Sequence, residues 1–373
     1  MRNIFTIILL VVPMMLLAQT PYKFKRVIDL ETTPVISQGN TGTCWSFSAS
    51  SFVESEILRQ SGKAIDISEM YTVRQTYMAK AENYVMRQGK AQFSEGGLAH
   101  DVLKSIKANG LVPQEIYDGL DPDKNYHTHA EMSAVLEAML DTYIENPGKK
   151  LSKKWKPAIN AVLDVYLGAV PEEFAYEGKT YNPQTFLEMT GIDPDHYVSL
   201  TSFSHSEFYK PFVLNIPDNF SNGSFYNLPL DEFIATLDHS LANGYTVEFD
   251  CDMSEPTFSA RHGLAVIPED AANNMAALTS VYPELKISQQ YRQEEFENYT
   301  TTDDHLMHIT GLLKDQNDTK YYLIKNSWGN LSNEIAQDGF LHMSESYMRL
   351  KTISITVHKD AIPDTIRKKL GLQ

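Results

Sequence analysis

The sequence predicts an α+β protein with two lobes. Apolar residues recur at helical spacing through much of the first half of the chain, whereas runs typical of β-strands follow after about residue 245. The chain has 373 residues, enough for one large core or for two lobes around a cleft. Early helices and late strands are typical of α+β folds, in which the two kinds of element segregate.

The expected helices are marked by apolar spacing and by turn residues at their ends. The first is expected over residues 44–60 and stops at the Ser61-Gly62 turn. Further helices are expected at about 68–88, at 98–109, within 129–168, and at 230–243. Residues 170–230 are rich in Pro, Asn and Tyr, so we expect loops with short pieces of structure there.

The expected strands lie mainly in the second half of the chain. They are runs with apolar, β-branched and aromatic residues, at 245–249, 305–313, 321–325, 339–343 and 352–357. Upstream of the first helix, residues 21–43 read as an extended lead-in.

The charge balance excludes several classes of partner. The formal net charge is −16, and both nucleic acid and anionic lipid require clustered positive charge. The lysines of residues 149–156 surround Trp155 at a spacing that suits the solvated face of a helix. We therefore expect no nucleic-acid partner.

The first residues have the pattern of a secretory signal peptide. Arg2 precedes an apolar run over residues 4–18, and polar residues follow. This run of about fifteen residues contains Pro13 and is shorter than the roughly 20 residues that span a membrane. We expect residues 1–19 to be removed, leaving residues 20–373 as a secreted or periplasmic protein with no stable membrane anchor.

Cys44 lies at the start of the first expected helix, directly after a turn that contains Gly39 and Gly42. The dipole and the free N–H groups of a helix N-terminus stabilise a thiolate, which is a nucleophile. A single cysteine in this position is also common as a small buried apolar residue. The assignment therefore needs a second signal elsewhere in the chain.

That second signal is Asn326-Ser327-Trp328-Gly329, which follows a predicted strand carrying His305 and His308. A catalytic cysteine needs a histidine beside its sulfur, and the histidine needs a third group that fixes the orientation of its ring. The side-chain carbonyl of Asn326 can provide this third group.

Together these motifs resemble those of papain-like cysteine peptidases. Gln38 lies six residues before Cys44, Trp45 follows the cysteine, and the KNSWG segment supplies Asn326 and Trp328. The resemblance implies four catalytic residues, namely Cys44 as nucleophile, His305 as base, Asn326 as the group that orients the histidine, and Gln38 as an oxyanion donor. It also implies substrate-binding roles for Gly96, Gly97 and Trp328, the glycines lying in a Ser-Glu-Gly-Gly segment similar to the family's glycine pair.

Within this family the chain most resembles the branch of bleomycin hydrolase and aminopeptidase C, over roughly residues 30–365. The segment at 247–253 is similar to that branch's strand ending in Gly-Cys-Asp, with Asp250 in place of the glycine, which implies a structural role for Cys251. The implied fold is the papain-like two-lobe fold with a helical insertion. Its parts are a helical lobe at about 30–110, the insertion at about 111–225, and a β-rich lobe at about 226–360.

The choice of base is open between two histidines on one predicted strand. His305 fits the papain pattern because a small residue, Gly311, follows six positions later. His308 fits the looser Met-x-His pattern of bleomycin hydrolase. The two point to opposite faces of the strand, since their separation is odd, and we expect His305 to be the base.

The expected substrates are peptides or proteins, and the expected action is that of an aminopeptidase. In the bleomycin hydrolase branch a longer C-terminal tail folds into the cleft and restricts cleavage to substrate N-termini, and we expect this chain to stop before such an arm. The alternatives are an endopeptidase without the arm, an acyl-transfer enzyme with the same triad, and a non-catalytic binding module of papain fold. We expect no cofactor and no metal, and a homo-oligomer is left open.

Overall fold

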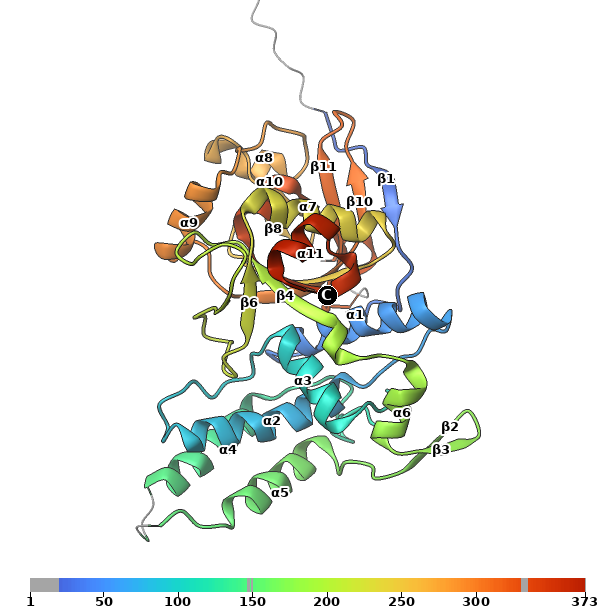
Figure 1. The fold of residues 1–373 in the computed structure, drawn as a ribbon, viewed down its shortest axis with the longest axis vertical. Helices are drawn as coiled ribbons and strands as arrows, with labels where there is room; N and C mark the ends of the chain where they lie inside the picture. The colour runs from blue at the N-terminus through green and yellow to red at the C-terminus, as the bar shows by residue number, and fades with distance from the viewer. Residues whose placement is uncertain (1–19, 146–147, 149, 330–334, 373) are drawn as a thin grey trace, which may run out of the picture.

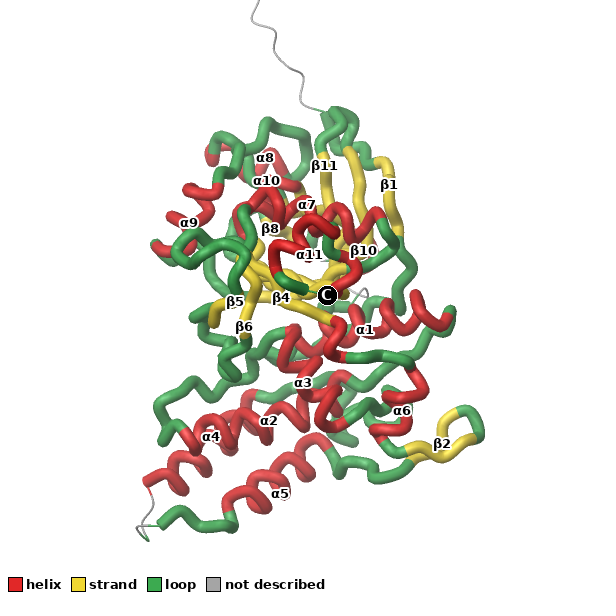
Figure 2. Tube along the Cα trace, viewed as in Figure 1, coloured by secondary structure: helices red, strands yellow, loops and turns green. Residues whose placement is uncertain are grey.

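The computed structural model describes residues 20–145, 148, 150–329 and 335–372 (Figure 1). The predicted signal peptide at 1–19 lies outside the described residues. The chain forms a helical lobe, drawn in the lower half of Figures 1 and 2, and a sheet lobe, drawn above it. Each lobe contains its own cluster of buried apolar side chains. The predicted α+β class is confirmed by this arrangement.

The helical lobe contains the predicted early helices. Its elements are α1 (Cys44–Ser61), α2 (Glu69–Met86), α3 (Ala99–Asn109), α4 (Ala130–Glu145), α5 (Trp155–Leu167), α6 (Pro183–Thr190) and the hairpin of β2 (Phe174–Tyr176) with β3 (Lys179–Tyr181). Helix α1 ends at Gly62, which adopts the left-handed conformation that glycine permits. Helix α2 is capped by the preceding residue, Ser68, whose side chain accepts a hydrogen bond from the N–H of Tyr71.

Helices α4 and α5 pack because each carries an apolar stripe. The buried side chains on α4 are Met132, Leu136 and Leu140, and those on α5 are Trp155, Ile159, Leu163 and Leu167. Residues four apart lie on one face of a helix, so each stripe faces the lobe interior. The region at 129–168 was expected to be helical, and it forms this pair.

The sheet lobe is built around a mixed sheet of eleven strands among the described residues. The order along the sheet is β5-β6-β4-β13-β7-β10-β11-β12-β9-β8, and β1 pairs with β10. The strands are β1 (Lys25–Asp29), β4 (Tyr197–Thr201), β5 (Pro211–Val213), β6 (Ser224–Asn227), β7 (Val247–Cys251), β8 (Phe258–Ser259), β9 (Leu264–Ala265), β10 (His305–Lys314), β11 (Lys320–Lys325), β12 (Phe340–Ser344) and β13 (Thr352–His358).

Helices surround this sheet. They are α7 (Leu230–Ala242), α8 (Asn274–Ala277), α9 (Gln289–Glu297), α10 (Glu345–Lys351) and α11 (Asp364–Leu370), with short 3-10 turns at Pro194–His196, Ala271–Asn273, Gln337–Gly339 and Lys359–Ala361. Among the described residues, no helix has both the length and the apolar character needed to cross a membrane.

The sheet extends beyond the expected strands. Strand β1 falls in the expected lead-in, and β4, β5 and β6 fall in the segment expected as an insertion. Strand β4 pairs antiparallel with β13, with Leu200 opposite Ile355. Leu200 is fully buried, so the end of the expected insertion contributes to the core of the sheet lobe.

Helix α1 lies at the boundary between the lobes (Figure 1). Every residue from Cys44 to Ile57 is buried, since the helix contacts α2 and α3 on one side and β7 and β10 on the other. A helix that is buried all round lacks the usual solvent-facing stripe. Its N-terminal residue is thereby held against the strand that begins at His305.

Candidate active site

Cys44 is the first residue of α1 and is almost completely buried. Burial raises the pKa of its thiol to about 12, while hydrogen bonds from the backbone N–H groups of Leu306 and Trp45 lower it in part. The bond from Leu306 places the sulfur beside the residue that follows His305. Without a positive partner, the thiol therefore stays neutral.

His305 and Asn326 are joined by a hydrogen bond of 2.8 Å between Nε2 and Oδ1. Because the asparagine oxygen can only accept, Nε2 carries the hydrogen and Nδ1 carries the lone pair. Burial lowers the pKa of His305, and the bond to Asn326 raises it in part. The ring of Trp328 stacks on the imidazole at 5.0 Å between centroids and covers it.

Gln38 is tied to the same asparagine segment. Its backbone N–H donates to the carbonyl of Ser327 at 2.8 Å. Its side-chain Oε1 accepts from Ser327 Oγ at 2.6 Å, and its Nε2 donates to the carbonyl of Thr41 at 2.7 Å. These bonds hold the amide between the turn before Cys44 and the strand end that carries Asn326.

The Ser94–Gly97 segment lies beside the Cys44 turn. The indole Nε1 of Trp45 donates to the carbonyl of Glu95 at 2.9 Å, and the carboxylate of Glu95 accepts from the N–H of Gly42 at 2.6 Å. A Cβ atom on Gly97 would lie 3.1 Å from the Trp45 ring, closer than side chains normally approach. The structure thus brings both predicted glycines to the neighbourhood of Cys44.

His308 lies in a different environment from His305. It is fully buried, and its Nδ1 is 3.0 Å from Ser51 Oγ in the middle of α1. Burial, together with the charge of Lys325, holds the pKa of His308 well below its usual value. The described residues therefore place His305, and not His308, beside Asn326.

Three aspartates gather near Cys44, and we call Asp218, Asp250 and Asp303 the Asp218 group. The N–H of Asp218 donates to the carboxylate of Asp303 at 3.1 Å, and a side chain on Gly96 would overlap the carboxylate of Asp218. The charges of Asp218 and Asp250 both act on the Cys44 thiol. Burial raises the pKa of all three carboxyls, that of Asp303 to about 7.

The Asp218 group was not predicted, because its members come from three segments of the chain. Of the three, only Asp250 stood in a recognised motif, where it replaces the glycine of Gly-Cys-Asp. Lys80 is a nearby cation, which donates to the carbonyls of Ser94 and Gly96. Burial lowers the pKa of Lys80 to about 8, and the negative charge of Asp218 opposes that shift. Lys80 therefore balances part of the negative charge.

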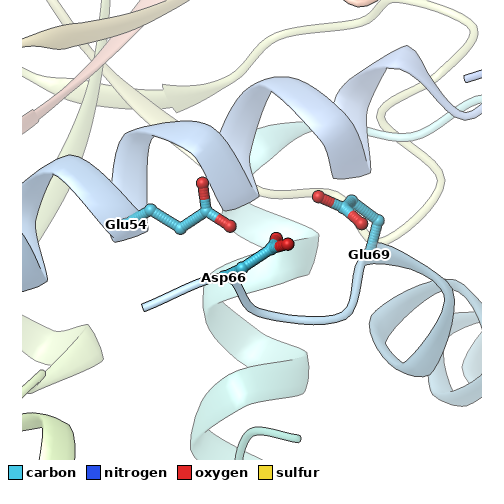
Figure 3. Close-up of side chains that lie close together, drawn as sticks. All are labelled: Glu54, Asp66 and Glu69. Carbon is cyan, nitrogen blue, oxygen red and sulfur yellow. The ribbon is translucent and has the colours of Figure 1, made fainter. Parts of the chain in front are cut away.

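A second acidic cluster consists of Glu54, Asp66 and Glu69, which we call the Glu54 group (Figure 3). Its carboxylates point toward one another, with ligand atoms within 4.8 Å, a spacing that could suit a metal ion. The group lines a cavity of about 180 Å³ together with Lys325. The charge of Lys325 lowers the pKa of Glu54 against the dominant effect of burial, so this ammonium already supplies positive charge.

The comparisons with known proteins agree with this fold. Residues 15–372 match the Peptidase C1-like family. Aminopeptidase C of Lactococcus lactis subsp. lactis is 23% identical over 376 residues, which cover 90% of this chain and 83% of that protein. Aminopeptidase G of Lactobacillus delbrueckii subsp. lactis is 21% identical over 376 residues, covering 89% of this chain and 82% of that protein.

Among solved structures, PepW of Lactobacillus rhamnosis HN001 has a similar fold. The TM-score is 0.73 at 17% identity, over 93% of this chain and 84% of that chain. The predicted papain-like fold and the resemblance to the aminopeptidase C branch are confirmed by these matches. The chain belongs to the peptidase C1-like family of cysteine peptidases.

Proposed function

We propose that this protein hydrolyses peptides as an aminopeptidase, with Cys44 as nucleophile and His305 as base. The observation that carries this proposal is the 2.8 Å bond that orients His305 through Asn326. The sulfur of Cys44 lies against the N–H of Leu306, the next residue. Peptides or proteins are the substrates.

The first step is transfer of the Cys44 proton to Nδ1 of His305. Burial opposes a lone thiolate and also a lone imidazolium, as the directions of both pKa shifts indicate. Formed together, the two charges stabilise each other, with help from the N–H groups at the sulfur and from Asn326 at the imidazolium. Trp328 covers the ring and limits water access.

The thiolate then attacks the peptide carbonyl, and the negative charge moves to the carbonyl oxygen. The backbone N–H of Cys44 and the amide of Gln38 are the proposed donors to this oxygen. An amide nitrogen carries two hydrogens, and the bond to Thr41 uses one of them. Loss of one such donor typically lowers kcat by about 10²–10³-fold.

Collapse of the tetrahedral intermediate breaks the C–N bond, and His305 gives its proton to the leaving amine. Water then attacks the thioester while His305 takes one proton from it. The thiol of Cys44 leaves, the carboxylic acid is released, and the histidine is neutral again. The ring must therefore hold its orientation through both halves of the reaction, which is the role proposed for Asn326.

The Asp218 group supports cleavage at substrate N-termini. A substrate that extended past Gly96 would meet the carboxylate of Asp218, whereas a free α-ammonium would pair with it. Asp250 lies opposite Leu306 in the pairing of β7 with β10, and the N–H of Leu306 contacts the sulfur of Cys44, so the Asp218 group and the nucleophile belong to the same region. The names of the similar proteins, aminopeptidases C and G, agree with this reading.

The catalytic assignment is tested with an epoxide that alkylates thiol peptidases. We expect Cys44 alone to be labelled, and Cys44→Ala to abolish hydrolysis of a fluorogenic peptide. Cys251→Ala is the matched control, since Cys251 is also buried and free but lies within β7. Labelling at Cys251, or activity that survives in Cys44→Ala, would overturn the assignment.

We also propose that the protein is exported. The support is the signal-peptide pattern of residues 1–19, which precede the described part of the chain. N-terminal sequencing of protein recovered from the periplasm or the medium should give a start near residue 20. A start at Met1 in the cytoplasmic fraction would contradict export.

A further inference from the structure

A polar pocket lies beside the turn that precedes Cys44. Its volume is about 190 Å³, and its wall comes from the loop before α4 and from the end of α5. His127 and His129 both line it, as do the carboxylates of Asp121 and Glu131. The two histidines are separated by one residue, a His-x-His spacing that the sequence-based expectation of no metal overlooked.

Both imidazoles are buried and poorly satisfied. His127 is 9% exposed and His129 is 2% exposed. No hydrogen-bond partner exists among the described residues for Nδ1 of His127 or for either ring nitrogen of His129. Leaving a buried polar group unpaired costs about 1–3 kcal/mol, so three such nitrogens in one pocket indicate a missing ligand or solvent.

The hydrogen bonding of His127 favours a metal-binding tautomer. The ring hydrogen-bonds to the backbone carbonyl of Gly119, to which it can only donate. Since Nδ1 has no partner, the donor is Nε2, and Nδ1 carries the lone pair. Histidines that bind metals usually donate their other nitrogen to a carbonyl or carboxylate in this way.

Carboxylates also line the pocket. Asp121 and Glu131 are part of its wall. An oxygen of Asp121 lies 3.7 Å from Lys124 Nζ, and an oxygen of Glu131 accepts from the Tyr166 hydroxyl at 2.6 Å.

We propose that His127 and His129 bind a divalent transition-metal ion, for which Zn²⁺ is the fitting choice, with Glu131 and water completing the ligand set. In the structure the two imidazoles and a carboxylate oxygen do not all lie within 4.8 Å of one another, so the exposed side chain of Glu131 must rotate toward the rings. Imidazole nitrogen is a preferred ligand of Zn²⁺, and mixed histidine and carboxylate sites are common. The ring centroids are 6.3 Å apart. Two imidazoles that bind one tetrahedral Zn²⁺ at about 2.1 Å have centroids about 5 Å apart, so the rings must approach by roughly 1 Å.

The proposed metal site contacts the turn of residues 38–43, which precedes Cys44. The carbonyl of His127 accepts from the N–H of Asn40 at 2.8 Å, and a side chain on Gly39 would overlap the His127 backbone. Gln38 precedes these residues directly. A metal ion that fixes His127 therefore supports the turn that positions the proposed oxyanion donor.

The test measures metal binding independently of peptidase activity. The Cys44→Ala protein, which lacks the catalytic thiol, is titrated with ZnCl₂ by calorimetry. We expect one Zn²⁺ per chain. The double variant His127→Gln with His129→Gln should bind at least about tenfold more weakly, since even outer-shell changes at metal sites cost 10–100-fold. His262→Gln, at an exposed histidine, is the matched control and should bind normally.

Circular dichroism shows whether the double variant folds. If it does not, the single variant His129→Gln replaces it in the titration. Substituting Co²⁺ should give the visible absorption of a tetrahedral site, and this absorption should be lost in the variant. No binding by the Cys44→Ala protein would overturn the proposal and assign the pocket to water. Equal affinity in the histidine variants would also overturn it, because the ion would then lie elsewhere, for example at the Glu54 group.

Discussion

The two acidic clusters of this protein contain the same type of side chain, a carboxylate, but differ in the partners of those carboxylates. The Glu54 group has a cation, because Lys325 of β11 reaches across from the other lobe and bonds to Thr33 and Ser51 at 3.0 and 2.7 Å. The cation near the Asp218 group, Lys80, donates to the carbonyls of Ser94 and Gly96, and neither oxygen of Asp250 makes a hydrogen bond of normal geometry. A satisfied cluster holds two lobes together, whereas an unsatisfied one near a nucleophile can receive a positively charged substrate.

Strand β10 shows the same division within four residues. His305 at its start bonds to Asn326, and His308 bonds to Ser51 on the side of the Glu54 group. Position along one strand therefore separates a histidine proposed to transfer protons from one that is held in the interior. Single substitutions can test this division.

The largest effect is expected from His305→Ala. Removal of a general acid–base group typically costs about 10²–10⁴-fold in rate, and the thiolate would also lose its counter-ion. His308→Ala is the matched variant, and its main effect should be on the free energy of unfolding, since it removes a fully buried side chain together with its hydrogen bond to Ser51. Steady-state kinetics and urea unfolding of both variants separate the two roles. A greater loss of kcat in His308→Ala would reverse the assignment.

The second largest effect is expected on stability, at the contact between the lobes where Lys325 lies beside the Glu54 group. Lys325→Met should lower the free energy of unfolding by about 3–5 kcal/mol, because it leaves buried carboxylates without their cation. Lys314→Met removes an exposed pair with Asp318 and should cost no more than about 1 kcal/mol. Urea unfolding at pH 8 measures both. Equal costs would show that the Glu54 group is neutral in the folded protein and does not need Lys325.

A smaller and more selective effect is expected from Asp218→Asn. Hydrogen bonds to charged groups contribute about 1.5–3 kcal/mol, so kcat/KM for a peptide with a free α-amine should fall by roughly 10–150-fold. The same variant should change little for an N-acetylated peptide, because that substrate brings no positive charge. Equal losses on both peptides would mean that Asp218 supports the Gly96 segment rather than the substrate amine.

The smallest expected effect is on pH dependence. The pKa of Asp303 is raised to about 7, so the Asp218 group gains negative charge as the pH rises through 7. A peptide α-ammonium loses its charge above about pH 8. The ratio of kcat/KM for free and acetylated peptides should therefore rise from pH 5.5 to 7.5 and fall again by pH 9. Asp303→Asn should flatten the rise of this ratio between pH 5.5 and 7.5. An unchanged profile would exclude Asp303 as the titrating group.

Much of the fold was predictable because the signals are local. The helical spacing of residues 44–60 and the glycine that follows determine α1, and Cys44 and Asn326 lie in short motifs. The extent of the sheet was not predictable, since β4 joins β13 only through tertiary pairing. The choice between His305 and His308 likewise depends on which face of β10 meets Asn326.

The Asp218 group and the His127 pocket lie beyond what sequence patterns can show. Asp218 is an ordinary loop residue until packing brings it against Gly96. The His-x-His spacing of His127 and His129 gains weight only from the structure, in which three of their buried ring nitrogens have no hydrogen-bond partner among the described residues. In each case the chemistry arises from contacts between segments that are distant along the chain.

The central claim is that the Asp218 group makes this enzyme select a free amino terminus. The most direct test compares kcat/KM of the wild-type protein for one fluorogenic peptide with a free α-amine and for its N-acetylated form at pH 7.5. We expect kcat/KM to be at least about tenfold higher for the free amine. This factor corresponds to about 1.5 kcal/mol, the lower end of the contribution of a hydrogen bond to a charged group. Equal cleavage of the two peptides would contradict the claim and identify the protein as an endopeptidase with the same catalytic residues.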